Sequence, residues 1–540
     1  MPENRKLRFA VLVDGPLLKK WQSDSIQHVL DTKHAEFVGF IQNTGSRNQP
    51  TTSVSLGFRY IYKKIDRNGP LQLTEWEKQF PTTPKFSFTP ESKGIANFFN
   101  ESDLEALKML ELDVVIRFGF GILKGEVLSI PTYGIWSFHH GNPRKYRGGP
   151  AAFWEIFEGN SITGSILQQL NEKLDQGQLI REGFFQTTNH SYQANLYHVL
   201  EETAVWPALA VKAIISHPQQ KLALQTISEK GKLYKVPGNF TSLRFIFNVF
   251  LNKVSFHLNR LFRAEKWNVG RVNQPIEELI NKPMKLIKWL NEAPSNSYYA
   301  DPFTWKKKEV LLELYNYKSS KGSLKKLDTN SGKLIHFLDD KTHYSYPFSI
   351  QHGEKRYVLP ENYKNNLLQL HEVDNQLNVL QKYKILEGPW IDPTLFQKDG
   401  KWWLSCVHAS SPKENLYLFY ANSIEGPYNP HLLNPVLTDI RSSRPAGTPF
   451  LLNEKIIRPT QNCSKTYGGS VVLKQIDKLS PTEFEESFVK EILPQEGRYS
   501  NGLHTLSTSG EEILVDGKRY YFNFWNFWNQ LKASFNKQTI

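Results

Sequence analysis

Residues 133–180 contain several residue types that can move protons and stabilise negative charge. Ser137 and His139 stand two residues apart, a tight turn follows at residues 146–148, and Asp175 lies two residues before a glycine. An imidazole can polarise a carbonyl or take a proton from an amine, and a carboxylate can hold that imidazole in place. Titratable groups gathered in so short a segment are typical of an active site.

The same ordered set resembles the catalytic domain shared by methionyl-tRNA, glycinamide ribonucleotide and sugar-nucleotide formyltransferases, whose pattern is Asn-x-His, Tyr-Arg-Gly and Asp-x-Gly. The resemblance implies that His139 stabilises the oxyanion of a tetrahedral intermediate and that Asp175 supports His139 and handles the amine proton. Ser137 replaces the family's Asn, and its hydroxyl has one donor where an amide has two. A water at Ser137, or the neighbouring His140, could supply the missing donor. Taken singly, His139 could equally be a core histidine and Asp175 a turn residue.

The segment after the apolar strand Asp113–Arg117 resembles the folate pocket of the same family, where glycines allow close approach of the backbone. This implies 10-formyltetrahydrofolate as the co-substrate. The residues expected to bind it are Phe118, Gly119, Phe120, Gly121 and Ile122. The residues expected at the acceptor site are His140, Tyr146, Arg147 and Gly148.

A Rossmann-like α/β domain is predicted over 1–232. A buried strand at Phe9–Val13, a helix at Leu17–Leu30 and a strand at Ala35–Ile41 form a βαβ opening, which favours a parallel sheet. Residues 43–95 are polar and rich in turn residues, which is typical of an inserted loop region. A further helix is predicted at Leu196–Ile215 from its apolar spacing.

Positive charge is concentrated in a predicted linker at residues 233–265 and its surroundings. Of the net charge of +13, the segment 230–288 supplies +9, with twelve Lys or Arg against three Glu. An amphipathic basic helix is predicted at 240–263. It could bury its apolar stripe against a neighbouring domain, or it could dock on an anionic membrane surface.

Residues 266–540 predict a five-bladed β-propeller. Similar short motifs recur along this region at a nearly regular spacing, which suits one four-stranded blade per repeat. The motifs lie at Asp301, Pro347, Asp392, Gly447 and His504. Hairpin turns are predicted at Lys398–Lys401 and Asp516–Lys518.

Two aspartates of the predicted propeller resemble catalytic residues of five-bladed furanosidase-type glycoside hydrolases. Asp301 matches the base and Asp392 the aspartate that modulates the pKa of the acid, while the expected Glu is absent and Glu361, in an earlier blade, is a stand-in. Both aspartates could instead be architectural. A polar funnel suited to a phosphorylated or sugar ligand is predicted to be lined by Arg444, Arg458, Gln461, Tyr467 and His504. This region also resembles the propeller-like part of some plant glycosphingolipid glycosyltransferases, which implies a task involving glycans.

Other signals set limits on function. The two cysteines lie outside disulfide or metal-binding spacings, so we expect neither a disulfide nor a metal. No apolar run approaches the roughly 20 residues of a membrane span, and the two cysteines suit a reducing compartment, so we expect a soluble, cytoplasmic protein. We expect no nucleic-acid binding, because most of the excess positive charge lies in the linker and no barrel like the tRNA-binding domain of the resembled tRNA-formylating enzymes is identifiable after residue 215. The leading hypothesis is formyl transfer from 10-formyltetrahydrofolate to the amine of an amino sugar or sugar nucleotide. The alternatives are a glycoside hydrolase in the propeller and a non-catalytic glycan-binding protein.

Overall fold

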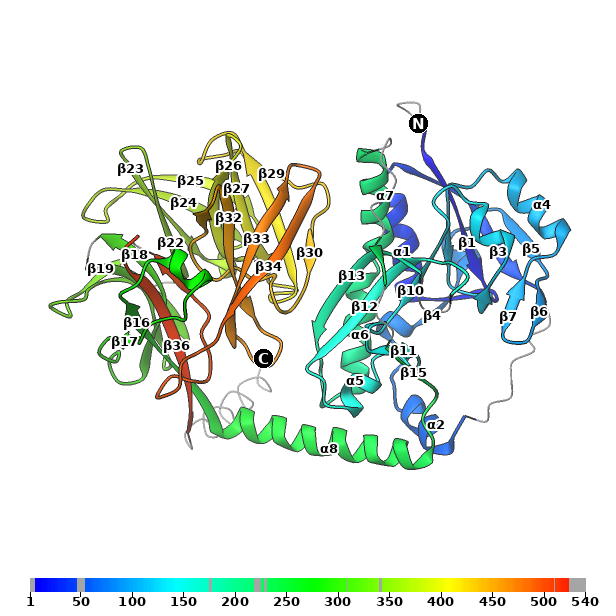
Figure 1. Cartoon of the computed structure of the whole chain (residues 1–540), viewed down its shortest axis with the longest axis horizontal. Helices are drawn as coiled ribbons and strands as arrows, with labels where there is room; N and C mark the ends of the chain where they lie inside the picture. The colour runs from blue at the N-terminus through cyan, green and yellow to red at the C-terminus, as the bar shows by residue number, and fades with distance from the viewer. Residues whose placement is uncertain are drawn as a thin grey trace. The chain divides into compact units, whose positions relative to one another are not determined.

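The computed structural model divides into two compact units, Met1–Val254 and Ser255–Ile540 (Figure 1). The division falls within the helix α8 (Asn239–Phe262), at the position of the predicted linker. The residues described by the structure are 5–45, 54–173, 177–217, 225–227, 231–306, 308–338, 342–508 and 510–523. Within these ranges no helix combines the length and apolar character needed to cross a membrane.

The first unit is built on an eight-stranded mixed sheet, which confirms the predicted α/β Rossmann-like class. Its strand order is β14-β13-β12-β10-β8-β1-β3-β5, and the five strands from β10 to β5 are parallel. The strands β12, β13 and β14 extend the sheet in antiparallel fashion. The bounds are β1 Leu7–Val13, β3 Ala35–Asn43, β5 Lys85–Phe88, β8 Val114–Arg117, β10 Ile135–His139, β12 Ile162–Gln169, β13 Gln178–Gln186 and β14 Gln225–Thr226.

Helices cover both faces of this sheet, so its central strand β1 is apolar from Phe9 to Val13. Phe9 and Val11 face the cluster that includes residues of α1 (Lys20–Asp31) and α7 (Trp206–Ser216). Ala10 and Leu12 face the opposite cluster, which includes Leu107 of α4 (Glu101–Met109). The remaining helices of this unit are α2 Leu56–Lys63, α3 Trp76–Gln79, α5 Trp154–Phe157, α6 Tyr192–Thr203 and the 3-10 turns η1 Gly69–Leu71 and η2 Glu126–Ser129.

Three predictions for the first unit need correction. The single helix predicted at Leu196–Ile215 is two helices, α6 and α7, because Pro207 lacks a backbone N–H and is tolerated only in a first turn. The helix predicted from Leu17 starts at Lys20, since residues 17–19 form β2. Part of the expected loop region 43–95 is structured, and its β5 extends the main sheet. Short strands complete the unit: β2 Leu17–Lys19, β4 Leu73–Glu75, β6 Glu91–Lys93, β7 Ala96–Phe98, β9 Ile122–Leu123, β11 Tyr146–Gly148 and β15 Lys232–Tyr234.

The second unit is all-β and forms five antiparallel sheets. The sheets are β17-β16-β36-β35, β18 to β21, β22 to β25, β26 to β30 and β31 to β34. Each predicted repeat motif lies in or just before the first strand of a sheet, or before β35. The strands and turns are β16 Arg263–Val272, η3 Ile276–Ile280, β17 Lys288–Trp289, β18 Ser297–Lys306, β19 Glu309–Asn316, β20 Lys321–Asp328, β21 Leu334–Phe337, β22 Ser345–His352, β23 Lys355–Glu361, η4 Tyr363–Asn365, β24 Leu367–Val373, β25 Val379–Glu387, β26 Trp390–Lys398, β27 Lys401–His408, β28 Asn415–Ala421, β29 Asn429–Pro430, β30 Leu437–Thr438, β31 Phe450–Leu452, β32 Lys455–Asn462, β33 Ser470–Leu479, β34 Phe484–Ile492, β35 Leu506–Thr508 and β36 Ile513–Phe522.

One of the two predicted hairpin turns is confirmed and the other is wrong. Asp399 and Gly400 form the turn between β26 and β27. Asp516–Lys518 lies instead inside β36, which pairs along its whole length with β16. The Asp-Gly pair is a strong local turn signal, but Asp516 is fully buried and accepts hydrogen bonds from the backbone N–H groups of His504 and Thr505. Tertiary contacts therefore override the local signal.

Candidate functional site

The first site lies where β1 and β8 end side by side. The strand β3 lies on one side of β1 and β8 on the other, so a crevice opens beyond their carboxyl ends. Asp14 follows β1, and its Oδ1 accepts a hydrogen bond of 2.7 Å from the backbone N–H of Phe120. A Cβ on Gly119 would stand 2.6 Å from the backbone nitrogen of Asp14, so only glycine fits there.

Two cavities adjoin at this crevice. The smaller, of about 130 Å³, contains His139, Gly121 and Ile122 in its wall. The larger, of about 310 Å³, contains Ser137 and His140. Both cavities share the residues Arg117, Gly121 and Phe138. Of the residues predicted to bind the cofactor, Phe118 and Gly119 line the larger cavity, Ile122 lines the smaller and Gly121 lines both; Phe120 is fully buried.

Ser137 is a hydrogen-bond acceptor for Arg117. The Arg117 Nε and Nη2 atoms lie 3.2 and 2.8 Å from Ser137 Oγ, and the serine is almost completely buried. The Ser137 oxygen thus anchors a guanidinium that lines both cavities. Sequence reasoning missed Arg117 because it ends a strand without any motif. The sequence signal that another hydrogen-bond donor was needed was the presence of Ser137 in place of the Asn of the resembled family.

His139 and His140 belong to different cavities. The Nε2 atom of His139 lies 2.9 Å from the carbonyl oxygen of Tyr146, so in the neutral ring Nε2 carries the proton and Nδ1 is the basic nitrogen. The Nδ1 atom of His140 lies 3.0 Å from Ser165 Oγ, while its buried Nε2 has no hydrogen-bond partner among the described residues. Burial lowers the pKa of His140 to about 3, with smaller contributions from the charges of His139 and Lys19. His140 is therefore a neutral ring at physiological pH.

The structure separates Tyr146, Arg147 and Gly148 from these cavities. Tyr146, Arg147 and Gly148 form β11, which pairs with β15 and lines neither cavity. The Tyr146 hydroxyl donates to Glu158 at 3.1 Å, and burial raises the pKa of Tyr146 to about 12. Asp175 lies outside the described residues. Its described neighbours in sequence, Glu172 and Lys173, line the His139 cavity.

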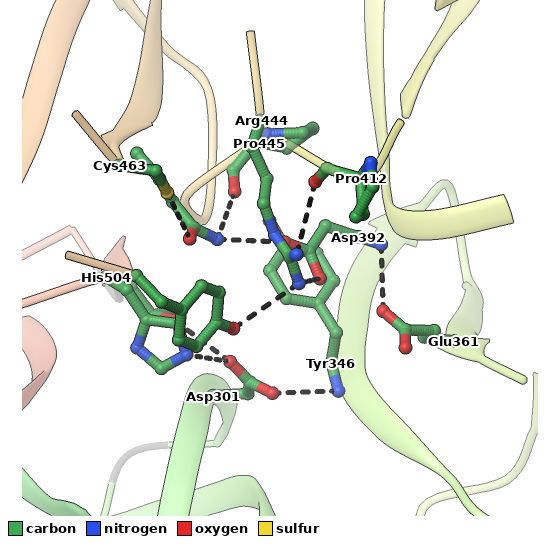
Figure 2. Close-up of polar contacts among 12 residues, drawn as sticks. Asp301, Tyr346, Glu361, Asp392, Pro412, Arg444, Pro445, Cys463 and His504 are labelled. Carbon is green, nitrogen blue, oxygen red and sulfur yellow. Dashed lines mark hydrogen bonds and ion pairs between the residues drawn. The ribbon is translucent and has the colours of Figure 1, made fainter. Parts of the chain in front are cut away.

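The second unit contains a cavity of about 170 Å³ that is lined by most of the residues predicted for this unit, Glu361 among them (Figure 2). Asp301, Asp392 and His504 all line it. Arg458 does not: it is buried elsewhere and binds Glu486 and the carbonyl oxygens of Ser442 and Ser443. Sequence reasoning placed Arg458 in the funnel because it follows an inner motif. The complete lining is Trp267, Tyr298, Ala300, Asp301, Glu313, Tyr315, His343, Ser345, Glu361, Asp392, Arg444, Tyr467 and His504.

The two predicted aspartates are held as hydrogen-bond acceptors. Asp392 accepts from Arg444 Nε at 2.6 Å and from Gln461 Nε2 at 2.8 Å (Figure 2). Asp301 accepts from the backbone N–H of Tyr346 at 3.2 Å, and its Oδ1 lies 3.2 Å from His504 Nε2. Burial opposes ionisation of Asp301, but the hydrogen bond and charge of His504 hold the pKa of Asp301 below its usual value.

Two glutamates in the same cavity have raised pKa values. Burial, followed by the negative charge of Asp392, raises the pKa of Glu361 to about 8. Burial also raises the pKa of Glu313, and the charges of Asp301 and Glu361 add to this effect. Glu313 lies in β19 outside any motif and was not predicted. At neutral pH the cavity therefore combines a protonated carboxylic acid with an ionised carboxylate.

We expect His504 to make the stability of the second unit depend on pH. Burial lowers its pKa, but the charges and hydrogen bonds of Asp516 and Asp301 prevail and raise it to about 10. Because the folded pKa is raised, this stabilisation is fully present below about pH 6.5 and is lost as the pH rises through about 10. Hydrogen exchange of β16 and β36 peptides across this range should show a falling free energy of unfolding. His504→Gln should flatten the curve, and the exposed control His352→Gln should not; equal curves for all three proteins would contradict the assignment.

Comparison with known proteins shows that two parts of the chain are similar to two different families. The family model described as "Formyl transferase" matches residues 69–208. The model described as "Glucosamine inositolphosphorylceramide transferase 1, N-terminal" matches residues 244–506. The chain therefore combines a formyltransferase-type domain with a second large region, and both matching families are named for transferases.

Individual relatives agree with this division. A glucosamine inositolphosphorylceramide transferase 1 from Oryza sativa subsp. japonica is 32% identical over 210 residues, which is 36% of this chain and 28% of the relative. A methionyl-tRNA formyltransferase from Prochlorococcus marinus (strain MIT 9312) is 32% identical over 123 residues, 22% of this chain and 35% of the relative. The chain thus spans about a third of the length of each of these relatives.

Solved structures with some likeness include enzymes of two kinds. A phosphoribosylglycinamide formyltransferase from Anaplasma phagocytophilum has a TM-score of 0.29 and 15% identity, and the match covers 42% of this chain and 98% of that chain. An exo-beta-1,3-galactanase from Phanerochaete chrysosporium has a TM-score of 0.28 and 16% identity, and the match covers 36% of this chain and 52% of that chain.

Proposed function

We propose that this protein transfers a formyl group from 10-formyltetrahydrofolate to the amine of an amino sugar or sugar nucleotide. The observation that carries the proposal is the pair of adjoining cavities that share Arg117, Gly121 and Phe138. A transfer reaction needs two ligands whose reacting atoms meet, and adjoining sites provide this. The match of residues 69–208 to the formyl transferase family supports the type of group that is transferred.

In this proposal the formyl donor occupies the His139 cavity and the acceptor amine enters from the His140 cavity. The amine nitrogen attacks the formyl carbon, and the bond between that carbon and the folate N10 then breaks. The amine proton passes through His139 and Asp175 to N10, which leaves tetrahydrofolate and a formamide. The Arg117 guanidinium, anchored on Ser137, stabilises the oxyanion in place of the family's Asn.

Arg117→Lys tests this role. Lysine keeps the charge but has a single nitrogen, whereas the guanidinium donates from Nε and Nη2 to Ser137 and from Nη1 to the Gly121 carbonyl oxygen. We therefore expect kcat for glucosamine formylation to fall by about 100-fold or more. Binding of a folate analogue should change much less. The exposed control Arg59→Lys should leave both unchanged. Wild-type kcat in Arg117→Lys would exclude a role for Arg117 in stabilising the oxyanion.

We infer further that the five sheets of the second unit are the blades of a propeller that recognises the sugar. The strands β16 and β36, from opposite ends of this unit, share one sheet, as ring closure would require. Residues from all five sheets or their leading segments meet at one cavity, which contains Asp301, Ser345, Asp392, Arg444 and His504. The plant relatives are named for the transfer of glucosamine, which supports an amino sugar as the ligand.

A second candidate function is glycoside hydrolysis in this cavity. It is favoured by the raised pKa of Glu361 and the lowered pKa of Asp301, because hydrolysis needs a protonated acid beside an ionised carboxylate. Release of reducing sugar from arabinan or xylan that is lost in Glu361→Gln and in Asp392→Asn would support it. Binding of sugar without turnover would instead support a glycan-binding role.

The deciding experiment is calorimetric titration of the full chain with a stable 10-formyltetrahydrofolate analogue. Saturable binding that is weakened by Ile122→Trp, at a residue that lines the His139 cavity and not the His140 cavity, would locate the donor in the His139 cavity. The folded state of the variant must be checked by circular dichroism. No binding by the wild-type protein would refute formyl transfer from folate.

A further inference from the structure

The helix α8 presents an apolar stripe that no described residue of the first unit covers. The stripe residues are spaced by three or four positions, which places them on one face of the helix. Their exposed fractions are 81% for Phe240, 63% for Leu243, 59% for Phe247, 60% for Phe250, 48% for Leu251 and 40% for Val254. All six lie in the first compact unit.

A different face of α8 attaches the helix to the first unit. Phe245 is buried and stacks on Phe153, with the ring centroids 4.0 Å apart. Its ring also meets that of Tyr192 edge-on, and Ser242 is fully buried. The stripe is therefore not needed to hold the helix on the first unit. A contiguous exposed apolar patch of this kind marks an interaction surface.

The charged residues near the stripe indicate what kind of partner binds it. Residues 231–254 contain Lys232, Lys235, Arg244 and Lys253 and no Asp or Glu. A second copy of the chain would bring two such cationic segments together, which is unfavourable. An anionic lipid surface attracts them, and its headgroup region accepts an apolar helix face. The combination of apolar stripe and cationic flank suits a bilayer better than it suits a protein partner of like charge.

We propose that α8 lies in the plane of an anionic membrane, with the stripe from Phe240 to Val254 inserted at the boundary between headgroups and acyl chains. The inference is independent of the proposed formyl transfer. It places the first unit, whose cavities adjoin β1 and β8, at a lipid surface.

The test is flotation of the full chain with vesicles of phosphatidylcholine alone or with about a third phosphatidylserine. We expect binding to the anionic vesicles only, reduced by high salt. Phe247→Gln with Phe250→Gln should lower the partition coefficient by at least about tenfold, because both aromatic rings leave the lipid. Asn248→Gln with Asn259→Gln, which alters neutral polar positions of the same helix, should leave it unchanged. Lys253→Gln should lower it about fivefold.

Three results would overturn the proposal. The first is no binding to anionic vesicles by the wild-type chain. The second is equal binding by the double phenylalanine variant when circular dichroism shows that it is folded. The third is a dimer in sedimentation velocity that the same double variant abolishes, since that result would show that a second copy covers the stripe.

Discussion

His139→Gln is expected to lower the rate of formyl transfer to glucosamine by about 10²–10⁴-fold, the usual contribution of a positioned acid or base. Glutamine can still donate a hydrogen bond to the Tyr146 carbonyl, which His139 Nε2 contacts at 2.9 Å, so the local fold should survive. It has no basic nitrogen in place of Nδ1, so it cannot carry the amine proton. Rapid-quench measurement of a single turnover with 10-formyltetrahydrofolate would isolate this step.

The control for this variant is His28→Gln, an exposed histidine of α1 that lines neither cavity. It should keep the wild-type rate. Binding of the folate analogue should also stay within a few-fold in His139→Gln, since the imidazole is proposed to act on the transition state. A fall in binding as large as the fall in rate would instead assign His139 to donor binding.

Arg458→Met is expected to lower the free energy of unfolding of the second unit by about 3–5 kcal/mol. The Arg458 and Glu486 side chains are 1% and 3% exposed and lie 2.7 Å apart, so the variant leaves a carboxylate buried without its main partner. Lys474, 3.7 Å from Glu486, offsets part of the loss and favours the lower end of this range. Hydrogen exchange in urea, followed in peptides of β32, β33 and β34, would measure the change.

The double variant Arg458→Met with Glu486→Leu separates the effect of the unpaired Glu486 charge from the effect of the other contacts that the Arg458 side chain makes. Removing both charges should restore most of the stability, because a buried ion pair is often no better than apolar side chains of similar volume. The backbone carbonyls of Ser442 and Ser443 lose their donor in both variants, so recovery should be incomplete. Equal instability of the single and double variants would show that those carbonyls, and not the charge, dominate.

The fold could be predicted from the sequence where a local pattern had one physical cause. The continuous apolar run of β1 follows from burial on both faces of a parallel sheet, and the predicted strand lies within the observed one. The prediction failed where residues that are distant in the sequence determine the local structure. The turn expected at Asp516–Lys518 became a strand because β16, at the opposite end of the second unit in sequence, supplies its partner.

Only those residues of the candidate sites that lie within sequence motifs could be predicted. Residues within motifs, such as His139, Asp301 and Asp392, do line cavities. Arg117 and Glu313 lie in ordinary strands, and only the folded sheets bring them to the cavities. Conversely, Arg458 has the right residue type and lies next to a motif, yet its side chain is buried away from the cavity. The role of a strand residue depends on the face of the sheet to which its side chain points. A strand that is buried on both faces, such as β32, has no polar–apolar alternation from which that face could be predicted.

The pairing of β16 with β36 determines when the second unit can be completed during synthesis. The strand β16 leaves the ribosome long before its partner, whereas every strand of the sheets from β18 to β25 has its neighbours close by in the chain. The first unit and the intervening sheets can therefore assemble while translation continues, but β16 has an open edge until residues 513–522 emerge. A ribosome that stalls before that point holds a nascent chain with an unpaired strand edge, and we expect chaperone demand to peak in that interval.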